Sequence, residues 1–178
     1  MSLLLIRHTK PIVEKNICYG QLDIPLDINH YLIKRKKIYK TIKQLNLYWD
    51  WIYSSPSIRC KFLALYLVKK LSIPIFYHDF LKEFHYGKWE GLSYNKIENE
   101  FNKWANDYIY QSTPEGESLN SFLERIRNIY IFLIKQNKNI IIITHIGVIR
   151  GFYLFYHNLS IENYFDFNLD YGEMLLLN

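Results

Sequence analysis

Short apolar runs alternate along the chain with longer segments that carry charged and polar residues. The runs predict buried β-strands, because they are too short for helices and rich in Ile, Leu and aromatic residues. They lie at residues 3–6, 51–53, 73–76, 140–143 and 173–177. The longer segments predict helices, and after Ser118 the apolar positions keep the 3.6-residue period of a helix with one buried face. These helices are expected at residues 30–46, 57–71, 93–107, 118–133 and 147–156.

Strands that alternate with helices are typical of a single α/β domain with a mainly parallel sheet, here expected to span residues 1–178. Pro74 favours a place at the sheet edge for the third strand. Ser55 or Ser57 is expected to cap the helix that ends at Leu71, with Pro56 in its first turn. In a sheet of this kind, ligands bind at the carboxyl ends of the strands.

The composition fits a folded protein, since 49% of the 178 residues are hydrophobic. The formal net charge is +5, from 22 Lys and Arg against 17 Asp and Glu. Six of the basic residues fall within the predicted helix at 30–46: Lys34, Arg35, Lys36, Lys37, Lys40 and Lys43. Without them, 16 basic residues face 17 acidic ones. The helix is interpreted as a surface helix with a solvated basic face, and the alternative is a patch that binds anions or nucleic acid.

Cysteine usage and hydropathy favour the cytoplasm. The two cysteines, Cys18 and Cys60, are too few for a disulfide framework. No apolar run approaches the length of a signal peptide core or a membrane span, so no membrane partner is expected. Aromatic residues are numerous, with 16 Tyr and 11 Phe, and leave enough apolar material for a homodimer interface.

Three predicted strand ends carry side chains suited to an anion. Arg7 and His8 follow the first strand, a short polar turn leads from the second strand to Arg59, and His145 follows the isoleucine run. Parallel neighbours would bring two guanidinium and two imidazole groups to one crevice. Arginine binds phosphate through two parallel hydrogen bonds, and a neutral histidine beside it offers a nucleophilic nitrogen. The alternative is that each residue is structural, as a lone histidine or a helix-starting arginine usually is.

Six blocks of sequence, in order along nearly the whole chain, resemble the histidine phosphatase (phosphoglycerate-mutase-like) superfamily. They are Leu-Ile-Arg-His-Thr at 5–9, Tyr-Gly-Gln-Leu-Asp-Ile-Pro-Leu at 19–26, Ser-Ser-Pro-Ser-Ile-Arg at 54–59, the block at 81–91 that contains Glu83, Pro-Glu-Gly-Glu-Ser at 114–118 and Thr-His-Ile-Gly-Val-Ile-Arg at 144–150. The resemblance implies a three-layer α/β/α sandwich, no metal or cofactor, and a small phosphate ester as substrate.

The resemblance also implies roles for individual residues. His8 would attack phosphorus and carry a phosphohistidine, while Arg7, Arg59 and His145 would hold the phosphate oxygens. Glu83 would protonate the leaving alcohol and then activate water. The candidate substrate-binding residues are Gln21, Ser57, Thr9 and Ile146.

Two positions depart from the usual family pattern. Lys10 stands where many members have Glu, and Ile146 stands where many have Gly. They motivate an alternative in which the chain is an inactive module that binds phosphorylated ligands. The Arg7-His8-Thr9 opening and residues 17–23 look most like the branch that removes the 5′-phosphate of α-ribazole phosphate, or of the matching cobalamin precursor. A sugar-phosphate phosphatase or a phosphoglycerate mutase is the enzymatic alternative.

Overall fold

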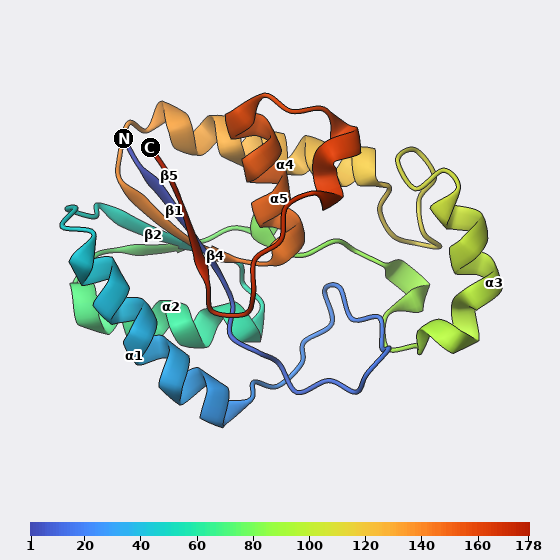
Figure 1. Ribbon diagram of the computed structural model, residues 1–178, viewed down its shortest axis with the longest axis horizontal. Helices are drawn as coiled ribbons and strands as arrows, with labels where there is room; N and C mark the ends of the chain where they lie inside the picture. Colours follow the sequence, from blue (N-terminus) through green and yellow to red (C-terminus); the bar gives the residue numbers. More distant parts are fainter.

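The computed structural model describes all 178 residues and contains one five-stranded sheet (Figure 1). The strands are β1 (Leu3–Arg7), β2 (Trp51–Ser54), β3 (Ile75–Tyr77), β4 (Ile140–Thr144) and β5 (Met174–Leu177). Their order across the sheet is β3-β2-β4-β1-β5. The first four are parallel and β5 runs antiparallel to β1. The mainly parallel sheet confirms the prediction, and β3 lies at an edge as expected from Pro74.

Helices cover both faces of the sheet, which makes the three-layer sandwich that the resemblance implies (Figure 1). Helices α1 (Ile28–Gln44) and α2 (Ile58–Leu71) pack on the face that contains Leu4 and Ile6. Helices α4 (Leu119–Lys135) and α5 (Ile146–His157) pack on the opposite face, against Leu3 and Leu5. Because successive strand residues point to opposite faces, a strand covered on both sides reads as an unbroken apolar run.

Helix α3 (Tyr94–Ala105) lies away from the sheet, in a side lobe of the molecule (Figure 1). The lobe has a small core of its own, formed by Cys18, Trp89 and Ile97. Cys18 is therefore a buried apolar filler in this structure. Three short 3-10 helices complete the fold: η1 (Asp79–Leu81), η2 (Gly87–Trp89) and η3 (Ile161–Phe165).

The start of α2 differs from the prediction. Ser57 is the N-cap residue, so Pro56 precedes the helix and does not lie in its first turn. The Ser57 side chain makes no capping hydrogen bond. Instead the carboxylate of Asp23, far away in the sequence, accepts a hydrogen bond from the Ile58 amide at 3.0 Å. A long-range contact thus replaces the expected local cap.

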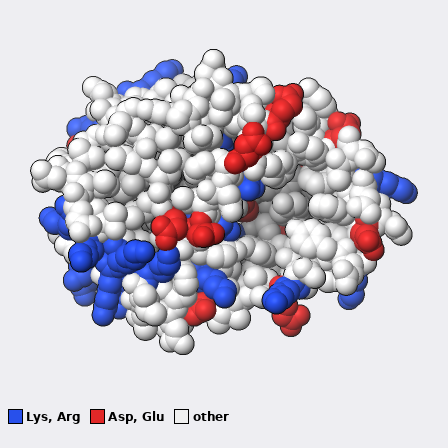
Figure 2. All heavy atoms as spheres, in the orientation of Figure 1, with Lys and Arg blue, Asp and Glu red and all other residues white.

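The basic helix is a surface helix, as predicted. Tyr31, Ile38 and Ile42 form its buried face, while Lys36 and Lys40 are exposed. Figure 2 shows Lys and Arg side chains gathered over α1, and a hollow between the sheet body and the α3 lobe. No helix in the structure combines the length and the hydropathy that a membrane crossing requires.

Candidate active site

The carboxyl ends of β1, β2 and β4 bring the predicted residues together. In the sheet, Arg7 lies beside Thr144, so the residues that follow them, His8 and His145, are neighbours. Their rings are 5.1 Å apart between centroids, nearly edge to face. Both histidines are buried, with exposed fractions of 2% and 0%. The convergence predicted from the strand ends is therefore present.

His8 is held as a neutral imidazole with one free nitrogen. Its Nδ1 lies 2.8 Å from the carbonyl oxygen of Thr9. A carbonyl only accepts hydrogen bonds, so Nδ1 carries the proton and Nε2 keeps its lone pair. Burial, followed by the positive charge of Arg59, holds the pKa of His8 well below 6.5. The ring is thus unprotonated at neutral pH, as a nucleophile must be.

Arg59 and His145 form a buried unit. Arg59 is fully buried, and its Nε donates to Nδ1 of His145 at 3.3 Å. The second ring nitrogen of His145 then carries the proton and donates to Oγ of Ser55 at 2.9 Å. Burial and the charge of Arg59 hold the pKa of His145 well below 6.5. Both nitrogens of His145 are engaged by side chains, so the phosphate-binding role implied for it stays a prediction.

Arg59 also anchors the loop that follows β1. Its Nη1 donates to the Leu22 carbonyl at 2.8 Å and its Nη2 to the Gly20 carbonyl at 2.5 Å. A guanidinium has five N–H donors, so two remain for an oxyanion. Ser57 lies beside this unit, and its hydroxyl accepts a hydrogen bond from Ser55 at 3.2 Å.

Arg7 and Thr9 present donors that the protein leaves unpaired. The Nε of Arg7 and the hydroxyl of Thr9 are buried and have no hydrogen-bond partner. Such groups are costly unless something satisfies them. Both residues flank His8, and the oxygens of a phosphate group are suitable partners for both. The residues at this strand end therefore fit an anionic ligand.

Tyr171 is a site residue that the sequence did not reveal. The guanidinium of Arg7 lies 3.9 Å from the centre of the Tyr171 ring, and that ring is 5.5 Å from His8. The Tyr171 hydroxyl hydrogen-bonds to the hydroxyl of Tyr19 at 2.8 Å. The antiparallel pairing of β5 with β1 brings Tyr171 here, and no local motif marks it.

Glu83 reaches the site from the segment after η1. Its carboxylate accepts hydrogen bonds from the amide of Phe84 at 3.0 Å and from the amide of Gly147 at 3.2 Å. A Cβ on Gly147 would lie 2.2 Å from Oε1 of Glu83, so only glycine permits this approach.

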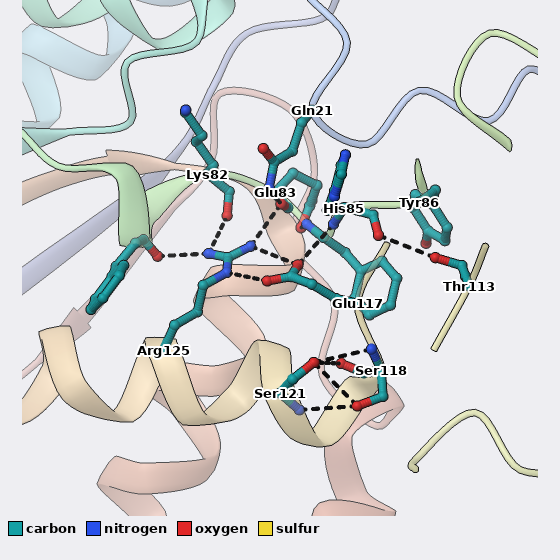
Figure 3. A network of polar contacts seen from close by, with 12 residues as sticks. Gln21, Lys82, Glu83, His85, Tyr86, Thr113, Glu117, Ser118, Ser121 and Arg125 are labelled. Carbon is teal, nitrogen blue, oxygen red and sulfur yellow. Dashed lines mark hydrogen bonds and ion pairs between the residues drawn. The ribbon is translucent and has the colours of Figure 1, made fainter. Parts of the chain in front are cut away.

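The two departures from the family pattern lie outside these contacts. The close approach to Glu83 is made by Gly147, one residue after Ile146, and Ile146 lines a cavity of about 80 Å³ beside Glu83. Lys10 is exposed. Gln21 does lie in the site region, where its side chain donates to the Glu83 carbonyl at 3.0 Å (Figure 3). No three His, Cys, Asp or Glu side chains converge as a metal site requires.

Comparison with known proteins gives one family. Residues 3–178 match the model of the histidine phosphatase superfamily, branch 1. A 2,3-bisphosphoglycerate-dependent phosphoglycerate mutase of Buchnera aphidicola subsp. Cinara cedri is 26% identical over 212 residues, which cover 98% of this chain and 92% of the mutase.

Two solved structures illustrate the likeness in fold. The α-ribazole phosphatase of Shigella flexneri superposes with a TM-score of 0.89 at 21% identity, covering 99% of this chain and 89% of that one. A mycobacterial glucosyl-3-phosphoglycerate phosphatase superposes with a TM-score of 0.85 at 17% identity, covering 98% and 88%.

Proposed function

Because the chain belongs to the histidine phosphatase superfamily, we propose that it is a phosphomonoesterase that acts through a phosphohistidine on His8. The observation that carries this proposal is the state of His8. The ring is neutral and buried, its Nδ1 proton is held by Thr9, and its Nε2 is free beside two arginines. A neutral ring with a free nitrogen beside positive charge suits nucleophilic attack on phosphorus. A histidine with a purely structural role does not need this arrangement.

In the first half of the proposed reaction, Nε2 of His8 bonds to phosphorus while the bond to the ester oxygen breaks. Glu83 gives its proton to the departing oxygen, so the leaving group departs as a neutral alcohol. Arg7 and Arg59 stabilise the negative charge on the remaining phosphate oxygens, which is the main contribution in phosphoryl transfer.

In the second half, water attacks the phosphohistidine. Glu83, now a carboxylate, takes a proton from that water as the oxygen bonds to phosphorus. The P–N bond breaks, its electron pair returns to Nε2, and phosphate leaves. The enzyme then has its initial protonation state, and Arg7 and Arg59 supply the positive charge without a metal or cofactor.

We propose α-ribazole 5′-phosphate, or the cobalamin 5′-phosphate precursor, as the substrate. The blocks at 5–9 and 17–23 support it, together with the similarity in fold to the Shigella flexneri α-ribazole phosphatase. A second candidate is a phosphoglycerate mutase or a sugar-phosphate phosphatase. The identity of 26% to a phosphoglycerate mutase favours that candidate.

A substrate panel tests the proposal. The purified protein is assayed with α-ribazole 5′-phosphate, 3-phosphoglycerate, glucosyl-3-phosphoglycerate and fructose phosphates, alongside the variant His8→Ala. We expect kcat/KM for α-ribazole 5′-phosphate to exceed the others by roughly tenfold or more. A preference for a sugar phosphate, or conversion of 3-phosphoglycerate to its 2-isomer, would overturn the substrate assignment. Equal turnover by His8→Ala would overturn the mechanism.

A further inference from the structure

The segment that carries Glu83 is unusually well anchored for a stretch with little regular structure. Residues 82–86 lie between η1 and η2, yet the carbonyls on both sides of Glu83 are hydrogen-bonded to distant parts of the chain. The Leu81 carbonyl accepts from the Thr144 hydroxyl at 2.7 Å, and the His85 carbonyl accepts from the Glu117 amide at 2.9 Å. These bonds hold the segment against β4 and the start of α4.

Arg125 of α4 provides most of the remaining anchors (Figure 3). Its Nη1 donates to the Phe80 carbonyl at 2.9 Å and to the Lys82 carbonyl at 2.8 Å. Its Nη2 donates to the carbonyl of Glu83 itself at 2.8 Å. One guanidinium thus holds three carbonyls in a run of four residues.

Glu117 fixes the guanidinium in turn. Its carboxylate accepts from Nε of Arg125 at 2.5 Å and from Nη2 at 3.0 Å, the parallel pair that suits Arg best. All five N–H donors of Arg125 are therefore used. The same carboxylate accepts from the His85 amide at 2.9 Å. The side chains of Arg125 and Glu117 are only 14% and 19% exposed, so solvent screens this pair weakly.

The Arg125–Glu117 pair makes no hydrogen bond to the histidines or Arg7. Its hydrogen-bonded connection to the site runs through the backbone of Glu83, and the charge of Arg125 adds a weaker, long-range effect on His145. That backbone decides whether the carboxylate reaches the Gly147 amide, to which it is bonded at 3.2 Å. Proton transfer needs heavy atoms about 2.6–3.2 Å apart, and a misplacement of about 1 Å can cost roughly 100-fold in rate.

We propose that Arg125, oriented by Glu117, is a positioning residue for proton transfer by Glu83. The inference rests on the proposed function, since it assumes that Glu83 is the general acid. Arg125 sets the place of Glu83 through the three carbonyls it holds, and Gln21 steadies the same Glu83 carbonyl from the opposite loop. Loss of the hydrogen bonds from Arg125 to these carbonyls leaves His8, Arg7 and Arg59 in place. It impairs proton transfer from Glu83 to the leaving group.

The dependence of kcat/KM on the leaving group distinguishes a positioning role of Arg125 from a purely structural one. A 2,4-dinitrophenolate leaves without a proton, whereas an unsubstituted phenolate or an alkoxide needs one. The constant kcat/KM reports the steps up to release of the alcohol, so later hydrolysis of the phosphohistidine does not enter it. A misplaced Glu83 lowers kcat/KM for phenyl phosphate and spares 2,4-dinitrophenyl phosphate, while a damaged fold lowers both.

The experiment compares the full-length wild type with Arg125→Gln, Arg125→Lys and Glu117→Gln on these two substrates. The control is Arg127→Gln, because Arg127 lies on the same helix but is exposed, lies over the Phe155 ring and makes none of the hydrogen bonds that Arg125 makes to residues 80–83. For Arg125→Gln we expect roughly a 30-fold loss in kcat/KM on phenyl phosphate, within the range of general acid catalysis. On 2,4-dinitrophenyl phosphate we expect a loss of about threefold or less.

Arg125→Lys keeps the charge but offers one nitrogen, so it is expected to show a smaller, equally selective loss. In a Glu83→Gln background, the additional substitution Arg125→Gln should lower kcat/KM for phenyl phosphate by a further factor of about two or less. The reason is that the side chain of the Glu83→Gln variant has no acidic proton to donate, so its position no longer matters. Equal losses on both substrates, or full additivity with Glu83→Gln, would overturn the inference. These results are distinct from failure of the proposed function, which would appear as undiminished turnover by His8→Ala.

Discussion

Acidification is expected to destabilise the free enzyme through its two buried active-site histidines. His8 and His145 have pKa values well below 6.5 in the folded protein, chiefly because burial disfavours their charged forms. In the unfolded chain they protonate as the pH falls through about 6.5. Below that pH the unfolded state binds more protons than the folded state, so stability present above pH 6.5 is lost on acidification.

The size of the effect follows from linkage. Between about pH 7.5 and pH 5.5, each such histidine lowers the free energy of unfolding by about 1.4 kcal/mol, so the pair lowers it by about 2.7 kcal/mol. The carboxyl groups of Glu162 and Glu173 have pKa values lowered from 4.5, so their contribution is lost only at more acidic pH. His30 shifts in the same direction as the buried pair but is only partly buried, and it adds less.

Urea denaturation at the two pH values, followed by circular dichroism, measures this loss. The variant His8→Gln has one of the two groups removed and should lose about 1.4 kcal/mol over the same interval. Saturating inorganic phosphate should reduce the loss in the wild type, because a bound anion favours protonated histidine. A free energy of unfolding that stays constant within about 0.5 kcal/mol, or an equal pH dependence in His8→Gln, would refute the reasoning.

Three further substitutions test separate parts of the structure. Gly147→Ala places a Cβ 2.2 Å from Glu83 Oε1 and 2.9 Å from the Tyr164 hydroxyl, so kcat/KM on phenyl phosphate should fall roughly tenfold or more; unchanged activity would contradict this. In Arg59→Lys, the single ammonium group cannot bind two carbonyls and His145 at the same time. Urea denaturation should therefore show that the free energy of unfolding falls by about 2–3 kcal/mol. Lys40→Gln changes an exposed residue of the basic helix and should leave activity and stability unaltered within about 0.5 kcal/mol, whereas a loss of activity would indicate that the basic face has a function.

The fold was predictable because each strand of the sheet interior is covered on both faces. The run Ile140–Ile143 alternates between the two cores, so every position is apolar and the run is unmistakable in the sequence. The start of α2 was less predictable, since its cap comes from Asp23 across the fold and not from the neighbouring serines. Local signals predict elements well and predict their long-range partners poorly.

The active site also contains residues that the sequence predicts and residues that only the structure reveals. Arg7, His8 and His145 lie at or just after the ends of strands, and Arg59 follows the end of β2 by one short turn. Parallel pairing brings those strand ends together. Arg125 looks in the sequence like any arginine on an amphipathic helix, and its role appears only when its three carbonyl partners are seen. Tyr171 is similarly hidden, because its neighbour Arg7 is distant in sequence.

The central claim is that His8 carries the phosphoryl group during turnover. Rapid quenching in alkali during steady-state hydrolysis of phenyl phosphate, followed by peptide mass spectrometry, tests it directly. We predict a single phosphoryl adduct on the peptide that contains His8, stable in alkali, labile in acid and absent from His8→Ala. Turnover without any adduct, or an adduct on another residue, would contradict the account.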